Sequence, residues 1–109
     1  MIITLKNGKN VDIQWNFMFL EFLEEYPGGF KVLKQDYNKQ NNLMKIHNHF
    51  LYSIIRANVE EPLKYREVLS LIETKDMKKL IDFVVKNFKE MDEFKKTDVN
   101  MYQKKKKRK

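Results

Sequence analysis

The two histidines of the chain, His47 and His49, are the residues whose types best fit metal binding. Apolar residues at helical spacing surround them, so both are expected on one helix. Residues two apart on a helix point about 200° from each other, so the two imidazole rings cannot converge on one ion. The chain also has no cysteine to complete a tetrahedral ligand set. The pattern therefore predicts no metal site, with His47 at the edge of the apolar stripe and His49 on the polar side.

Carboxylates and hydroxyls are plentiful, but their spacing does not fit catalysis. Adjacent acids occur at Glu24-Glu25, Glu60-Glu61 and Asp92-Glu93, and neighbours on a helix point about 100° apart. These pairs are expected on solvated polar faces, where no burial shifts a pKa toward a general acid or base. Ser53 and Ser70 lack the Gly-x-Ser-x-Gly context of a nucleophile elbow. We therefore expect a protein that is not an enzyme and uses no cofactor.

The most conspicuous charged feature is the C-terminal run of Lys104, Lys105, Lys106, Lys107, Arg108 and Lys109. These six residues account for most of the net charge of +7, because the rest of the chain has 16 basic and 15 acidic residues. Six like charges repel one another, so a disordered, flexible basic tail is expected over residues 96–109. Such a tail can bind nucleic acid through phosphates, but it lacks interleaved aromatic residues that stack on bases. A solvated chain end is favoured over a nucleic-acid arm.

The elements that position these residues begin with a β-hairpin over residues 1–15. Apolar residues occupy its odd positions, which are Ile3, Leu5, Val11, Ile13 and Trp15. This alternation is typical of a strand pair with one buried face. A two-residue Asn-Gly loop would mix the two faces, whereas a three-residue turn ending at Gly8 pairs Ile3 with Val11 and keeps them separate. The apolar face is expected to lie on helices, because a lone hairpin is marginal in water.

A small bundle of about five helices is expected over residues 16–94. Asn16 can cap the first helix, which the apolar pattern carries to about Tyr26. The breaker Pro27-Gly28-Gly29 separates it from a short second helix. A long third helix is expected over about 43–57, a short fourth over about 65–72, and a fifth from Thr74 or Asp76. The fold class is thus α+β, with a single globular domain over residues 1–95.

The first helix has more apolar surface than one-sided burial requires. Its apolar residues cover about 200° of arc, against a stripe of little more than about 100° for a helix packed on one side. Either the helix is central to the core, which is favoured, or part of its surface awaits a partner. In the second interpretation, Phe17, Met18, Phe22 and Tyr26 are the candidates for contact with a partner helix.

No segment of the sequence predicts a membrane span. The longest uninterrupted apolar run is the four residues from Phe17 to Leu20. A span needs about 20 apolar residues, and the apolar core of a secretory signal needs about 7 or more. The absence of cysteine suits a reducing compartment. We therefore expect a cytoplasmic protein with no membrane partner.

Four stretches of the chain together carry a family resemblance. They are Leu5 to Lys9 with the following Trp15, Leu20 to Gly29, Asn58 to Glu67, and Asp76 to Phe83. In their spacing, which spans most of the chain, they resemble the small tail assembly chaperones of long-tailed, siphovirus-type phages and prophages of Gram-positive bacteria. The resemblance implies a non-enzymatic chaperone of virion assembly.

The resemblance also implies partners and a place of action. Such chaperones coat the long, aggregation-prone tape-measure protein, help to recruit the tail-tube protein, and leave once the tail is built in the cytoplasm of the bacterial host cell. In many of these phages a programmed translational frameshift yields a longer form, and consecutive lysines such as Lys104 to Lys107 can be encoded by an A-rich run on which ribosomes slip. The alternatives are a small nucleic-acid-binding or regulatory protein that uses the basic tail, and a module that only self-associates.

Overall fold

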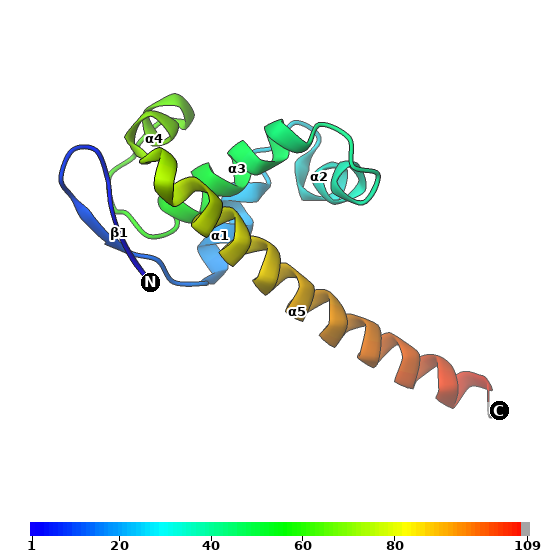
Figure 1. The fold of residues 1–109 in the computed structure, drawn as a ribbon. Helices are drawn as coiled ribbons and strands as arrows, with labels where there is room; N and C mark the ends of the chain where they lie inside the picture. Colours follow the sequence, from blue (N-terminus) through cyan, green and yellow to red (C-terminus); the bar gives the residue numbers. More distant parts are fainter. Residues whose placement is uncertain (108–109) are drawn as a thin grey trace.

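The first fifteen residues form the hairpin that the alternation predicts. In a computed structural model of the chain (Figure 1), β1 (Ile2–Thr4) pairs antiparallel with β2 (Asn10–Asp12), and Ile3 lies opposite Val11. The Leu5 N–H donates to the Lys9 carbonyl at 2.8 Å, and the Gly8 N–H donates to the Leu5 carbonyl at 2.9 Å. Gly8 adopts φ +86°. The three-residue turn with a left-handed glycine is therefore confirmed.

The structure describes the backbone of residues 1–107 and the side chains of residues 1–91. Within that backbone the hairpin is followed by α1 (Phe17–Leu23), α2 (Gly29–Asn38), α3 (Leu43–Arg56), α4 (Tyr65–Leu71) and α5 (Thr74–Lys107). The predicted α+β architecture of a hairpin packed on a small helical bundle is confirmed. α1 ends at Leu23, three residues before the predicted Tyr26, and the chain continues as turns up to the start of α2.

The third helix, α3, is the centre of the bundle. Its seven consecutive residues from His49 to Ile55 are all buried, because α1, α2, α4 and α5 each pack against it. The apolar face of the hairpin joins the same core. The buried apolar residues are Ile3, Leu5, Val11, Ile13, Phe19, Leu23, Tyr26, Leu33, Ile46, Phe50, Leu51, Tyr52, Ile54, Ile55, Val68, Ile72, Leu80 and Val84.

The last helix, α5, begins on the globule and then runs away from it (Figure 1). Leu80 and Val84 on its first turns are fully buried against the core. Its backbone continues as helix to Lys107, well past the position near residue 94 at which the apolar periodicity ends. The side chains of residues 92–109 lie outside the described part of the chain. The predicted domain boundary at residue 95 and the flexible tail over 96–109 therefore stay predictions.

The turn between α1 and α2 requires a glycine at residue 28. Gly28 has φ +92°, and a Cβ atom built on it would lie 2.6 Å from Cγ2 of Val32. Gly28→Ala is expected to lower the free energy of unfolding by about 1–2 kcal/mol from backbone strain alone, and further through displacement of Val32. Urea denaturation measures the loss. Gly8→Ala is the matched control, since Gly8 has φ +86° with no atom within 4 Å of its built Cβ; equal losses would contradict the Val32 contact.

Candidate interaction surface

The first turn of α1 exposes two large apolar side chains, which we call the α1 patch. Phe17 is 76% exposed and Met18 is 46% exposed. On the opposite face of the same helix, Phe19 and Leu23 are both 0% exposed and pack into the core. The excess apolar arc of this helix is thus divided between the core and solvent. Single exposed apolar residues are common, but two large adjacent ones on a short helix form a surface that can be covered by a partner.

Side-chain hydrogen bonds hold the start of α1 in place. The N-cap Asn16 accepts from the Phe19 N–H at 3.3 Å and donates to the Ala57 carbonyl at 3.1 Å. Just before it, the side chain of Asn58 accepts from the Gln14 N–H and donates to the Gln14 carbonyl, both at 3.1 Å. The first turn of α1 is therefore tied to the C-terminal end of α3. The α1 patch is presented on a fixed backbone, which lowers the entropic cost of binding.

The other two predicted contact residues are placed differently. Phe22 is half-buried, with its ring edge-on to Tyr52 at 6.1 Å between centroids and the Arg56 guanidinium 4.7 Å from its centroid. Tyr26 is a core residue, only 3% exposed, and its hydroxyl donates to Asp36 at 2.9 Å. Burial, followed by the bond to Asp36, raises the pKa of Tyr26. Tyr26 therefore offers no surface to a partner, a correction to the sequence-based prediction, because α2 and α3 cover it.

Three exposed carboxylates follow the α1 patch along the chain. Glu21 lies on α1, and Glu24 and Glu25 lie in the turn after it. The Glu24 carboxylate accepts from the Phe30 N–H at 3.3 Å, and the Glu25 carboxylate accepts from the Tyr52 hydroxyl at 2.8 Å. Glu24 and Glu25 are thus part of the packing of α1 on its neighbours. Residues 17–26 include no basic residue.

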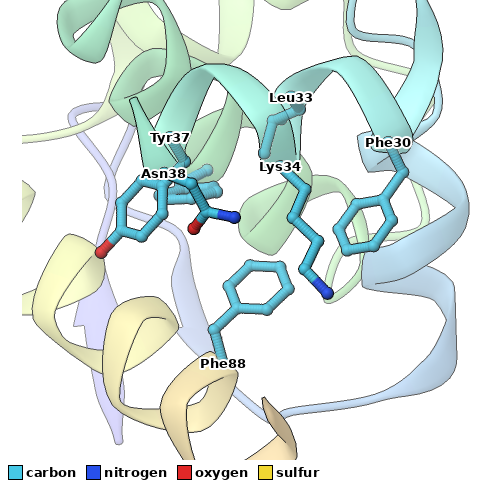
Figure 2. A pocket seen from close by; sticks show the side chains of 7 residues that line it. Phe30, Leu33, Lys34, Tyr37, Asn38 and Phe88 are labelled. Carbon is cyan, nitrogen blue, oxygen red and sulfur yellow. The ribbon is translucent and has the colours of Figure 1, made fainter. Parts of the chain in front are cut away.

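An apolar groove lies between α2 and α5, and the sequence patterns do not predict it. Figure 2 shows Phe30 and Lys34 on α2 pointing toward Phe88 on α5. The rings of Phe30 and Phe88 stack at 5.8 Å between centroids, with 18° between their planes. The cavity volume of this groove is about 30 Å³, and the groove is partly open to solvent. It is lined by Phe30, Leu33, Lys34, Tyr37, Asn38, Phe50 and Phe88.

His49 is a core residue, contrary to the prediction that it lies on the polar side of its helix. It is 8% exposed, and its ring lies 5.0 Å from the rings of both Tyr26 and Tyr65. Its Nδ1 atom is buried without a hydrogen-bond partner. Burial, followed by the nearby Lys45, lowers the pKa of His49, and Glu25 acts in the opposite direction. His47 is half-buried, which fits its predicted place at the edge of the apolar stripe, so only the prediction for His49 is wrong.

The described residues offer no metal centre and no membrane-spanning helix. Among residues 1–91, no three side chains of histidine, cysteine, aspartate or glutamate are arranged to hold an ion. No helix in the described part of the chain is both long and apolar enough to cross a bilayer. The α1 patch with its three carboxylates is the surface on which a function can be argued.

Known proteins give no direct guide to this surface. Comparisons of the chain with protein-family models, with curated proteins and with solved structures each find no match. The resemblance to tail assembly chaperones therefore rests on the four sequence stretches given above. The basic run from Lys104 to Lys109 lies beyond the described side chains, so its predicted role in nucleic-acid binding or frameshifting stays a prediction.

Proposed function

We propose that the chain is a non-enzymatic tail assembly chaperone that holds amphipathic helical segments of a tape-measure protein against the α1 patch. The observation that carries the proposal is the exposure of Phe17 and Met18 on a helix whose opposite face is fixed in the core. The sequence resemblance supports the identity of the client. It is also the sole support for a second partner, the tail-tube protein, which such a chaperone helps to recruit.

The geometry of the α1 patch suits helix-on-helix docking. An amphipathic helix presents anchors at i, i+3 and i+4, and it binds where apolar side chains of a partner are accessible and fixed. Phe17 and Met18 meet both conditions, since they are exposed and since Asn16 ties their backbone to α3. A long helical tape-measure protein has such apolar faces uncovered before the tail assembles around it.

The size of the α1 patch makes each contact weak. Complete burial of a fully exposed phenylalanine or methionine side chain contributes about 1.5–3 kcal/mol, so burying the parts of Phe17 and Met18 that are still exposed, 76% and 46%, supplies about 2–4 kcal/mol. Association costs about 4–15 kcal/mol in lost translational and rotational freedom, so one site alone binds weakly. Many copies along one client can still keep it soluble collectively. Weak individual sites also let the assembling tail tube displace the chaperone.

Removing the apolar side chains of the α1 patch tests the proposal. Phe17→Gln combined with Met18→Gln keeps the net charge and uses a good helix former. We expect this double variant to fold normally, because both positions are exposed, and to bind a helical tape-measure peptide at least about tenfold more weakly. Fluorescence anisotropy of the labelled peptide measures the affinity. The soluble fraction of a co-expressed tape-measure protein gives a second readout.

Met44→Gln is the matched control for the double variant. Met44 is 79% exposed at the start of α3, whereas Asn16 joins α1 to Ala57 at the other end of that helix. At 1.5 Å per residue the two ends lie about 20 Å apart. Binding is expected to be unchanged in the control. If the double variant has a normal thermal unfolding curve and still binds and solubilises the client as the unaltered chain does, the proposal is wrong.

A further inference from the structure

The charged side chains that α1 and the following turn place beside the α1 patch are all negative. Glu21 lies four residues after Phe17 and three residues after Met18, so all three side chains share one face of the helix. Glu24 and Glu25 extend the same sign into the following turn, and both are exposed. A partner that covers Phe17 and Met18 therefore also meets carboxylates.

Two of these carboxylates are held in fixed positions. Glu24 is oriented by the Phe30 N–H, and Glu25 is oriented by the Tyr52 hydroxyl. The carboxylate of Glu21 forms no hydrogen bond or ion pair with any side chain in the described part of the chain. Two basic groups of α3 lie on other rings, with Arg56 over the Phe22 ring and Lys45 over the Tyr26 ring. Glu21 thus remains available for a cation supplied by a partner.

We infer that the helix held by the α1 patch is a basic one, with lysine or arginine side chains on both sides of its apolar stripe. This inference rests on the proposed function and names the chemistry of its client. The apolar stripe covers Phe17 and Met18. The flanking cations pair with the carboxylate of Glu21 and are attracted by the carboxylates of Glu24 and Glu25. Complementary charge of this kind selects one partner over another of equal hydrophobicity.

Two model peptides test the sign of the partner. Each is an amphipathic helix of about 18 residues with the same leucine stripe, and its polar positions are either all lysine or all glutamate. We expect the lysine peptide to bind at least about tenfold more tightly at about 50 mM salt, and the difference to shrink at about 500 mM salt, where charges are screened within a few ångströms. Fluorescence anisotropy of each labelled peptide gives the two dissociation constants.

A single charge reversal locates the effect on the α1 face. Glu21→Lys is expected to weaken binding of the lysine peptide about three- to tenfold and to strengthen binding of the glutamate peptide. Glu90→Lys is the matched control, because Glu90 is also exposed and the charge change is the same. On α5 it points about 200° away from Phe88, which faces α2. The control is expected to change neither affinity.

The outcomes separate the inference from the function on which it rests. If both peptides bind with equal affinity, and the double variant Phe17→Gln, Met18→Gln binds both more weakly, the charge preference is overturned and the holding function stays intact. If the double variant Phe17→Gln, Met18→Gln binds both peptides as the unaltered chain does, the holding function itself is overturned. Sedimentation of the chain alone provides a third result. If the chain self-associates and the double variant Phe17→Gln, Met18→Gln does not, the α1 patch binds a second copy of the chain and the inference is overturned.

Discussion

Phe19→Ala is expected to lower the free energy of unfolding by about 3–5 kcal/mol, the range typical of a buried phenylalanine truncated to alanine. Phe19 is completely buried on the inner face of α1. Its ring centroid lies 4.8 Å from that of Trp15 and 5.8 Å from that of Phe88. The ring therefore joins the end of the hairpin segment, α1 and α5. Its removal leaves a cavity bounded by three elements that cannot close on it together.

Urea denaturation followed by far-UV circular dichroism measures this loss. A domain of this size has a total stability of about 5–15 kcal/mol, so the variant is expected to unfold at a much lower urea concentration. Phe17→Ala is the matched control, because it removes the same atoms two residues earlier from an exposed position. A change within about 0.5 kcal/mol is expected for the control. A loss below about 1 kcal/mol for Phe19→Ala would contradict the packing described here.

The hairpin could be predicted in detail because its determinants are local. The side-chain period of a strand is two, so one choice of register places Ile3, Leu5 and Val11 on a single face. Gly8 then supplies the left-handed residue that a three-residue turn needs. No contact with a distant part of the chain enters this argument. The observed pairing of Ile3 with Val11 and the Leu5–Lys9 hydrogen bond agree with it.

The environment of His49 could not be predicted from its own helix. A helical wheel assumes that a helix has one buried stripe and one wet face. α3 has almost no wet face between His49 and Ile55, because four other helices surround it. The side chains that cover His49 are Tyr26, which follows α1, and Tyr65, which begins α4. Their approach is a tertiary contact that no local periodicity records.

The candidate surface was predictable in part for the same reason. The apolar pattern of the first helix indicates an excess of apolar arc, but it does not indicate which side faces α3. The structure assigns Phe17 and Met18 to solvent and Tyr26 to the core. The groove lined by Phe30 and Phe88 lies between helices that are far apart in the sequence. From the sequence, each of these residues is predicted only as part of an ordinary amphipathic stripe.

The free energy of unfolding is expected to fall as the pH is lowered through about 6.5, and His49 is the cause. The groups around it are Glu25 and Tyr26 after α1, Lys45 and Tyr52 on α3, and Tyr65 on α4. Burial and Lys45 lower the pKa of His49 in the folded chain below its ordinary value of 6.5, despite the opposing effect of Glu25. Protonation in this cluster would place a cation among three tyrosine rings, beside Lys45 and with an unpaired Nδ1.

The sign of the pH effect follows from which state takes up the proton first. Well above pH 6.5, at about pH 7.5 and higher, His49 is neutral in both states, so its contribution to stability does not change with pH. As the pH falls below about 6.5, the unfolded chain binds a proton that the folded chain does not. The unfolding equilibrium constant then rises by up to about tenfold per pH unit, or about 1.4 kcal/mol, until the lowered pKa of the folded state is reached. Urea denaturation between about pH 7.5 and 5.5 measures this slope before most carboxylates titrate.

Two substitutions assign the slope to one residue. His49→Phe keeps a planar ring among Tyr26, Tyr52 and Tyr65 and removes the titrating group, so its stability is expected to be nearly constant over the same pH range. His47→Phe leaves His49 in place two residues away, so this variant is expected to retain the part of the slope that His49 causes. Because Tyr26 and Tyr52 are linked by hydrogen bonds to Asp36 and Glu25, loosening of this cluster at low pH would also loosen the turn that follows α1. An unchanged slope in His49→Phe would instead mean that another group takes up the proton and that the buried imidazole does not control the acid stability of the fold.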